Sequence, residues 1–286
     1  MEQKAKNIHW FPGHMKKAGN EIEDKIKLVD FVIVLLDARA PIATFNNYLV
    51  DKTKNKRKLY LLNKCDLADD EQTKKRILRL KDENSDAIAV SLENNKYKNE
   101  INKKIEEFLA LKKEKALNRG IKNITARAMV IGIPNVGKST FINMMIGKKV
   151  LGAQNTPGFT KKITWAKVNN NFELLDTPGV LEPSFDSKEI AINLALIGSI
   201  KATILPNEEL TTFCLNFLRK YYLYEFLERF KIEYKETDTN YDILKKIAIL
   251  RGLIKKGNEL DINKSEVLLL KEFKDGKITH FTLERI

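Results

Sequence analysis

Residues 132–139 combine glycine, lysine and serine at a spacing that suits phosphate binding. The segment reads G-I-P-N-V-G-K-S, with an apolar run at residues 126–131 before it and a helix-like run at residues 139–145 after it. Glycines let backbone N–H groups turn toward phosphate oxygens, and the N-terminus of a helix adds partial positive charge. The pattern therefore predicts a phosphate-binding loop between a buried strand and a helix.

Two side chains at the end of this loop carry charge or could bind a metal. Lys138 is expected to reach the β- and γ-phosphates of a nucleotide, and the Ser139 hydroxyl is expected to contact Mg²⁺. A glycine-rich loop can carry this pattern by chance, but the strand before it and the helix after it favour phosphate binding. The predicted phosphate contacts in the loop are Asn135, Val136, Gly137, Lys138, Ser139 and Thr140.

A second motif, D-T-P-G at residues 176–179, follows another apolar run. A carboxylate at a strand end beside a phosphate loop suits a Mg²⁺ contact, either direct or through water. Asp176 is therefore the predicted metal contact, and the backbone N–H of Gly179 is predicted to face the γ-phosphate. Proline and glycine also favour ordinary turns, but the position downstream of a phosphate loop favours the nucleotide role.

A threonine between these two motifs completes the predicted phosphate site. Thr160 lies in the segment T-P-G-F-T and is the candidate for contacts with both Mg²⁺ and the γ-phosphate. Thr164 is the competing residue, but it falls in a strand-like run. The predicted Mg²⁺ contacts are thus Ser139, Thr160 and Asp176.

The segment N-K-C-D at residues 63–66 suits recognition of a guanine base. An ionised Asp66 can accept from the two adjacent N–H donors on the Watson–Crick edge of guanine, which adenine does not present. Asn63 and Lys64 are predicted to brace this loop. Ser91 and Leu92, after another apolar run, could place backbone groups against the guanine carbonyl. The predicted ligands are GTP and GDP with Mg²⁺.

The guanine motif precedes the phosphate loop here, whereas ordinary GTPases carry it afterwards. The chain therefore looks like a circularly permuted GTPase. A glutamine that orients water in Ras-like GTPases follows D-x-x-G, and here that position is Val180, which cannot hydrogen-bond a water. Slow hydrolysis by the isolated protein is expected. His14 could position the water, although chemistry alone favours a turn in which His14 is a cap and Trp10 and Phe11 enter the core.

Three further segments extend this pattern: W-F-P-G-H-M at residues 10–15, D-A-R-A-P at residues 37–41 and the run from residue 251 to residue 261. With the nucleotide motifs they resemble the permuted GTPases that assemble the large ribosomal subunit, over nearly the whole chain. The resemblance implies a role in hydrolysis for His14 and a K⁺ contact for Asn135. A hydrophobic residue at Val180 is likewise a trait of that family.

The chain departs from the family pattern at three places. Residues 44–47 are T-F-N-N where the family usually has S-R-N-P, which puts in doubt an arginine contact made in relatives. Leu92 replaces the usual small residue, and Lys256 replaces one glycine of a pair. None of these changes falls in the phosphate loop or in the N-K-x-D segment.

Periodicity predicts how these motifs are held in space. Strands are expected at residues 31–37, 59–62, 87–90, 126–131, 163–168 and 172–175, with helices between several of them, notably at residues 100–117. This alternation predicts an α/β sheet with ligand loops at the strand ends. Helical spacing after residue 206 predicts a small all-helical domain whose aromatic residues form a core. The expected domains are an N-terminal arm at 1–20, a permuted P-loop GTPase domain at 21–205 and a helical RNA- or ribosome-binding domain at 206–286.

The composition narrows the partners and the compartment. The net charge of +13 favours an anionic partner, most simply nucleic acid. The family resemblance implies that this partner is ribosomal RNA, and no DNA partner is expected. No apolar run is long enough to span a membrane, and two cysteines, Cys65 and Cys214, make neither a disulfide framework nor a zinc site. A cytoplasmic monomer is expected.

The leading hypothesis is a GTPase that acts as an assembly factor on the large ribosomal subunit, whose surface stimulates hydrolysis. Two alternatives remain open from the sequence. One is a GTPase of tRNA modification or translation, because its chemistry is the same. The other is an RNA-binding switch with little catalysis of its own, which Val180 makes credible.

Overall fold

The structure is a computed structural model that describes residues 13–121, 124–148, 163–182, 185 and 187–286. Within these ranges six strands form one sheet: β1 (Phe31–Asp37), β2 (Lys58–Asn63), β3 (Ser85–Ala89), β4 (Ala126–Ile131), β5 (Thr164–Asn169) and β6 (Phe172–Asp176). All six strands predicted from the sequence are confirmed, with bounds that shift by at most two residues.

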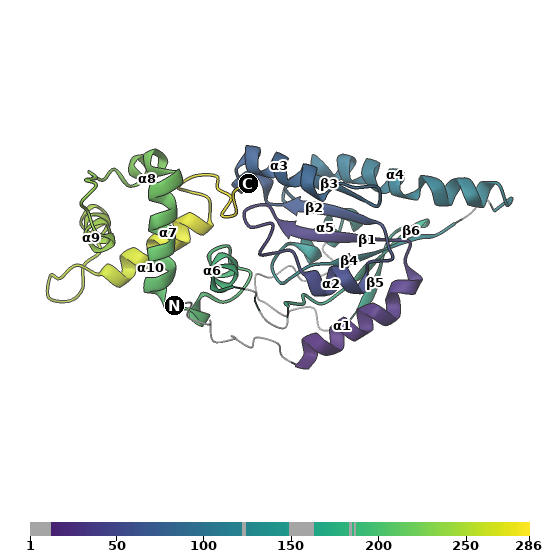
Figure 1. Cartoon of the computed structure of the whole chain (residues 1–286), viewed down its shortest axis with the longest axis horizontal. Coiled ribbons are helices and arrows are strands. Elements are labelled where there is room, and N and C mark those ends of the chain that lie inside the picture. The colour runs from purple at the N-terminus through teal and green to yellow at the C-terminus, as the bar shows by residue number, and fades with distance from the viewer. Residues whose placement is uncertain (1–12, 122–123, 149–162, 183–184, 186) are drawn as a thin grey trace.

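The helices fall into two groups (Figure 1). The first group surrounds the sheet and comprises α1 (Gly13–Lys25), α2 (Asn47–Lys52), α3 (Asp70–Leu80), α4 (Tyr97–Leu117) and α5 (Lys138–Ile146), with 3-10 helices η1 (Ile26–Leu28) and η2 (Cys65–Leu67). The second group lies to one side of the sheet and comprises α6 (Lys188–Leu196), η3 (Ala202–Ile204), α7 (Asn207–Tyr221), α8 (Leu223–Phe230), α9 (Asn240–Leu250) and α10 (Ile262–Lys274). We call residues 188–274 the helical region.

The order of the strands in the sheet is β3-β2-β1-β4-β6-β5, and only β5 is antiparallel to its neighbour. Every residue of β1 is buried, because this strand lies inside the sheet and helices cover both of its faces. The parallel strands β1, β2, β4 and β6 all end at one edge. The loops that follow them therefore gather at that edge, where α/β sheets bind ligands.

The helical region has its own core of aromatic and aliphatic side chains. Phe217 of α7 meets Phe273 of α10 edge to face at 6.1 Å, and Phe226 lies 5.4 Å from Phe230 within α8. All four rings are buried. The helical character of this part, and the placing of its aromatic residues in a core, are confirmed, so the fold is an α/β domain followed by a helical region.

Two connections hold the helical region beside the sheet. Helix α6 packs against α7 and α10, although it precedes residue 206 in the chain. The last residues then return to the α/β domain: the N–H of Phe281 donates to the carbonyl of Leu67 at 3.0 Å, and the N–H of Leu283 donates to that of Arg39 at 2.8 Å. We call residues 281–286 the tail; it ends beside α3, where the N–H of Ile286 donates to Gln72 Oε1 at 2.7 Å.

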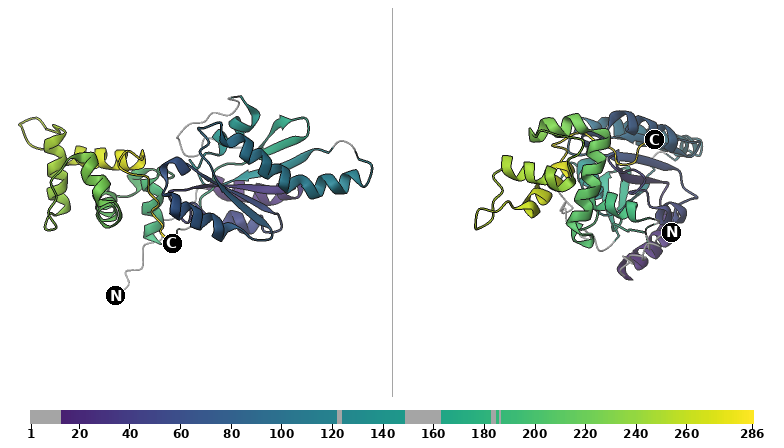
Figure 2. Two further views of the ribbon diagram at one scale, coloured as in Figure 1. Left: turned by 90° about the horizontal axis from the view of Figure 1, so that it is seen from above. Right: turned by 60° about the vertical axis from the view of Figure 1, so that its left-hand side comes forward.

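The elongated outline of the molecule follows from this arrangement, as the view from above shows (Figure 2). The sheet and its helices make one body, and α7 to α10 project from its side. No helix in the described ranges has the length and apolar content needed to cross a membrane.

Candidate functional site

The loops that carry the predicted motifs meet at the carboxyl edge of the sheet. Asn63, at the end of β2, donates from Nδ2 to the carbonyl of Val136 in the phosphate loop at 2.8 Å. Its Oδ1 accepts from the N–H of Leu92 at 3.1 Å. One buried amide therefore joins the guanine motif, the phosphate loop and the loop after β3, as expected of a residue that braces the base loop.

The phosphate loop has the backbone shape that its glycines predict. Gly137 has a φ of 104° and immediately precedes α5, a conformation that favours glycine. A Cβ at this position would also collide with the Nδ2 of Asn63. Ser139 and Thr140 lie in the first turn of α5 and are half-buried. A strand, a tight loop and a helix N-terminus thus follow one another, which is the arrangement that binds phosphate.

Lys138 is folded back against its own loop. Its Nζ donates to the carbonyl oxygens of Gly132 at 3.0 Å and of Ile133 at 2.8 Å, and 7% of the residue is exposed. Burial lowers the pKa of Lys138 to about 8, against the opposing attraction of Asp176. A buried ammonium whose hydrogen-bond partners among the described residues are two carbonyl groups is well placed to gain from a phosphate anion nearby.

Asp176 ends β6 as a fully buried carboxylate. Neither of its oxygens has a hydrogen-bond partner among the described residues. Burial raises the pKa of Asp176 to about 6, and Lys138 and the N–H of Thr177 act in the opposite direction. An unpartnered buried carboxylate is costly unless a cation pairs with it. The oxygen atoms and their position therefore fit Mg²⁺, which prefers oxygen ligands.

The turn after Asp176 packs tightly on the phosphate loop. A Cβ added to Gly179 would lie 2.9 Å from the Cα of Pro134 and 3.1 Å from the Nζ of Lys138. Val180, the residue after this turn, is buried, and its carbonyl accepts from Asn46 Nδ2 at 2.7 Å. The side chain of Val180 therefore faces the protein interior.

The guanine motif leaves its aspartate free to meet a ligand. Asp66 is exposed in η2, while Lys64 before it has a φ of 60° in the left-handed region. The Nζ of Lys64 pairs with Asp37 Oδ2 at 2.9 Å and donates to the carbonyl of Asn135 at 3.3 Å. Lys64 thus holds the base loop against both the end of β1 and the phosphate loop.

The loop after β3 lies beside the guanine motif. The N–H of Cys65 donates to the carbonyl of Val90 at 3.2 Å, which places Ser91 and Leu92 next to the base loop. Both residues are buried. The N–H of Leu92 already contacts Asn63, and the leucine side chain packs toward Gly137. Leu92, which replaces the usual small residue at this position, is therefore accommodated between the base loop and the phosphate loop.

Two predicted site residues fall outside the described part of the structure. Thr160 and the predicted segment T-P-G-F-T around it lie in the undescribed range 149–162. Trp10 and Phe11 fall in the undescribed range 1–12. His14 belongs to α1, but its side chain is also outside the described part. Thr164, the competing threonine, is the first residue of β5 and lies opposite Asp176 in the sheet.

The structure adds site residues that the sequence did not single out. Asp37 and Arg39 entered the sequence analysis only within a resembling motif, yet Asp37 contacts Lys64 directly. Burial raises the pKa of Asp37, but Arg39 and Lys64 outweigh it and hold that pKa well below its usual range. The position of Asp37 at the end of an apolar strand was a usable signal. For Asn46 no signal existed, because its partner Val180 is far away in the chain.

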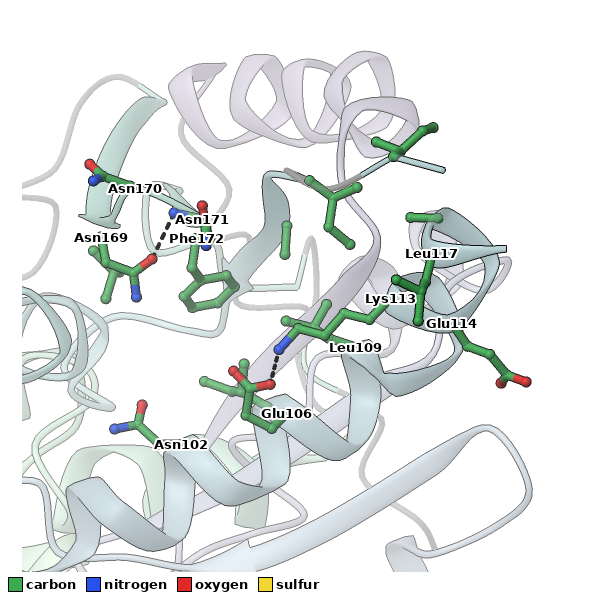
Figure 3. A pocket seen from close by; sticks show the side chains of 16 residues that line it. Asn102, Glu106, Leu109, Lys113, Glu114, Leu117, Asn169, Asn170, Asn171 and Phe172 are labelled. Atoms are coloured by element: carbon green, nitrogen blue, oxygen red, sulfur yellow. Dashed lines mark hydrogen bonds and ion pairs between the residues drawn. The ribbon is translucent and has the colours of Figure 1, made fainter. Parts of the chain in front are cut away.

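A cavity of about 850 Å³ lies elsewhere, between α4 and the turn that joins β5 to β6 (Figure 3). An ion pair between Lys113 and Glu106 crosses one side of it, and the N–H of Asn171 donates to Asn169 Oδ1 at 2.8 Å on the other. The cavity reaches Ala126, at the start of β4, and contains no motif residue. It is therefore at the opposite end of the strands from the nucleotide motifs.

Comparison with known proteins gives three consistent results. The family described as "50S ribosome-binding GTPase" matches residues 127–236, a span that begins at β4 and leaves the upstream guanine motif outside. A Bacillus cereus protein named "Ribosome biogenesis GTPase A" is 36% identical, over 97% of this chain and 93% of its own length. A Thermotoga maritima protein of the same name is 34% identical, over 97% of this chain and 94% of its own length.

Solved structures agree with these sequence matches. The crystal structure of GNP-bound YlqF from T. maritima has a TM-score of 0.61 at 28% identity and covers 94% of this chain and 98% of its own. A GDP-bound structure of the T. maritima YlqF has a TM-score of 0.63 at 27% identity, with 93% and 98% covered. Both titles name a guanine nucleotide as the bound molecule.

Proposed function

This chain belongs to the ribosome biogenesis GTPase A family, and from that premise we propose that it assembles the large ribosomal subunit through a cycle of GTP binding and hydrolysis. The reaction converts GTP and water to GDP and phosphate. The observation that carries the proposal is the contact between Asn63 and Val136, because it joins the N-K-C-D segment to the G-x-x-x-x-G-K-S loop. A guanine nucleotide would suit both segments, since one carries an acceptor for the guanine edge and the other carries donors for phosphates.

Each motif then has a role toward the nucleotide. Asp66 accepts from the two N–H groups on the guanine edge, and the loop of Ser91 and Leu92 lies against the base. The N–H groups of the phosphate loop and the ammonium of Lys138 bind the phosphates. Gly179 offers its N–H to the γ-phosphate.

A magnesium ion fits the same site. Ser139 and Asp176 would hold it, with Thr160 as a further contact, and the unpartnered oxygens of Asp176 support this assignment. The ion would neutralise charge on the β- and γ-phosphates. A K⁺ ion near Asn135 is a further expectation: the Nδ2 of Asn135 donates to the carbonyl of Gly198 at 2.9 Å, which fixes the side chain and leaves its amide oxygen to accept a cation.

Hydrolysis requires a group that positions the attacking water. Val180 has no polar side-chain atom and is buried, so we assign the task to His14, carried on α1. The water attacks the γ-phosphorus, and the bridging oxygen leaves with GDP. We infer that docking on the ribosomal particle places His14, so that hydrolysis by the isolated protein is slow and the particle stimulates it.

The partner is expected to be ribosomal RNA with its proteins. The net charge of +13 supports an anionic surface as the target. In the helical region Lys255 and Lys256 are exposed in the turn after α9, beside the exposed Ile254. We therefore assign residues 206–286 to the ribosome, residues 21–205 to the nucleotide and residues 1–20 to an arm that carries His14.

The first experiment is GTP hydrolysis by the purified protein in K⁺ buffer, alone and with isolated large ribosomal subunits. Small subunits at equal concentration are the matched control for a nonspecific RNA effect. Strong stimulation by large subunits alone is the expected result. Equal stimulation by both particles would point instead to a GTPase of translation or tRNA modification.

A passive switch is the second candidate, because the buried Val180 offers no group to a water. A passive switch predicts tight GTP binding and no increase in GTP turnover when mature or immature large subunits are added. The same assay with immature particles therefore separates an assembly factor, which responds to them, from a switch, which does not.

A further inference from the structure

Arg39 is the largest fully buried polar side chain among the described residues, and it sits between the α/β domain and the helical region. Its Nη2 and Nε donate to the two carboxylate oxygens of Asp37 at 2.8 Å and 2.9 Å. The same guanidinium also reaches the helical region. Nη1 donates to the carbonyl of Lys274 at 2.6 Å, and Nη2 donates to that of Ile197 at 3.1 Å.

These two carbonyl groups lie at helix ends. Lys274 is the last residue of α10, and Ile197 is the C-cap of α6. Carbonyl groups at a helix C-terminus lack partners within the helix and carry partial negative charge. A single guanidinium therefore satisfies the ends of two helices of the helical region while it neutralises a carboxylate of the α/β domain.

Asp37 also contacts the guanine motif. Asp37 Oδ2 pairs with both Arg39 and Lys64, the latter at 2.9 Å. The N–H of Ala38 donates to the carbonyl of Asn63 at 2.8 Å. A displacement of the guanine motif would thus disturb the partners of a buried carboxylate, and buried ion pairs tolerate the loss of a partner poorly.

The phosphate loop touches the same helix end. Asn135 donates to the carbonyl of Gly198, the residue after Ile197. Beside this contact lies a cavity of about 310 Å³ whose lining includes Asn135, Gly198 and Lys274. The Lys274 side chain lies against Gly198, because a Cβ added to that glycine would be 3.2 Å from Lys274 Cδ. The phosphate loop, the end of α6 and the end of α10 therefore meet around one cavity.

We propose that Arg39 is a positioning residue that couples the guanine motif to the ends of α6 and α10, so that nucleotide binding sets the placement of the helical region. The inference rests on the proposed roles of Lys64 and Asn63 at the guanine site. Coupling of this kind is reciprocal: a helical region held in place must strengthen nucleotide binding by the same factor.

The Arg39→Lys variant tests this function apart from simple charge balance. Lysine keeps a positive charge beside Asp37 but has one nitrogen on a flexible stem, so it cannot contact Asp37, Ile197 and Lys274 together. If Arg39 only neutralises Asp37, the variant will behave as the wild type. If Arg39 couples the two parts, the variant will keep its fold and lose the coupling.

Arg229→Lys is the matched control. Arg229 forms the same forked pair with Glu272 of α10, at 2.9 Å and 2.8 Å, but lies wholly within the helical region. It therefore reports the effect of losing a forked arginine contact to α10 without breaking the link to the guanine motif.

Hydrogen exchange of the backbone amides in α10 and the tail, with and without GDP or a non-hydrolysable GTP analogue, is the first measurement. Nucleotide should slow exchange at the end of α10 in the wild type and in Arg229→Lys, and this slowing should be lost in Arg39→Lys. Nucleotide affinity, measured with a fluorescent analogue, should fall roughly tenfold in Arg39→Lys only.

The outcomes separate this inference from the proposed function. Tight nucleotide binding by the wild type with no change of exchange in α10, or an Arg39→Lys variant that matches the wild type, would overturn the coupling alone. No guanine nucleotide binding by the wild type would overturn both. If Arg39→Lys does not fold, the double variant Arg39→Gln with Asp37→Asn removes both charges together, and it must also lose the slowing.

Discussion

The side chain of Asn63 bonds the carbonyl of Val136 at 2.8 Å although 73 residues separate them in the chain. This contact closes the guanine motif onto the phosphate loop. Gly137 is part of the same junction, because any Cβ there would collide with the Asn63 amide. The two loops are remote in the chain, so their spatial relation depends on such contacts.

Changing Asn63 to Ala should therefore weaken nucleotide binding and the fold together. The change leaves the Val136 carbonyl and the Leu92 N–H without partners in a buried place, which costs about 1–3 kcal/mol. We expect affinity for GDP and for GTP to fall by roughly fivefold to a hundredfold, since 1.4 kcal/mol corresponds to a factor of ten. Titration with a fluorescent nucleotide measures it, with the exposed Asn102→Ala on α4 as the control. Equal affinities in the two variants would contradict the bridging role.

Changing Gly179 to Ala should discriminate between the two nucleotides. The added methyl group would press on Pro134 and on the Nζ of Lys138, where the γ-phosphate is expected. Affinity for a GTP analogue should therefore fall more than affinity for GDP. Gly120→Ala is the control, because a Cβ there meets no atom within 4 Å; unlike Gly179, Gly120 has a left-handed backbone (φ 72°), so this variant reports backbone strain without a steric clash. A parallel loss for both nucleotides would argue against a γ-phosphate contact at Gly179.

Asp176 should make stability depend on pH when no nucleotide or metal is present. Burial raises its pKa from 3.8 to about 6, so between these values the folded protein binds a proton that the unfolded chain does not. Stability therefore falls as pH rises from 4 to 6, by about 3 kcal/mol for a single such group. Asp176→Asn should remove this fall in stability with rising pH. It should also stabilise the protein at pH 7, by an amount that is reduced by the loss of the attraction between Asp176 and Lys138. Urea unfolding in EDTA across this pH range measures the effect, and an unchanged pH dependence would contradict it.

The same variant should respond differently once Mg²⁺ is added. A metal ion requires the ionised carboxylate, so Mg²⁺ should strengthen GTP binding by the wild type above pH 6 and progressively less below it. In Asp176→Asn the benefit of Mg²⁺ should be small at every pH. Nucleotide titration with and without chelator gives the comparison, and a full Mg²⁺ response in the variant would move the metal contact elsewhere.

Changing His14 to Ala should lower stimulated GTP turnover far more than GTP affinity. A residue that positions water acts in the transition state and not in nucleotide binding, and such groups contribute roughly a hundredfold or more. Turnover is measured with large ribosomal subunits present, and His280→Ala, an exposed histidine in the last residues, is the control. Equal losses of turnover and affinity would indicate a structural role for His14.

Replacing K⁺ with Na⁺ should slow hydrolysis if Asn135 helps to hold a monovalent cation. The rate is compared at equal ionic strength in the two salts, with Asn135→Asp as a variant that keeps an oxygen at the position. No loss of rate in Na⁺ would remove the cation from the mechanism.

The sequence by itself determined the fold class and the motif loops. A short apolar run such as residues 31–37 favours a strand buried on both faces, and the structure has that strand with the same bounds. The glycine at position 137 was informative for a local reason, because it marks a backbone conformation that other residues rarely adopt. Signals of this kind lie within a few residues and need no tertiary contact.

Only the tertiary structure decided how the distant parts meet. Arg39 looks like one of many basic residues in the chain, and its contacts with Ile197 and Lys274 depend on where two later helices end. The bond from Asn46 to Val180 and the return of the tail along Arg39 also join segments that are remote in the chain. Side-chain hydrogen bonds between remote segments have no periodicity that a single sequence could reveal, so the coupling of the nucleotide site to the helical region had to come from the folded molecule.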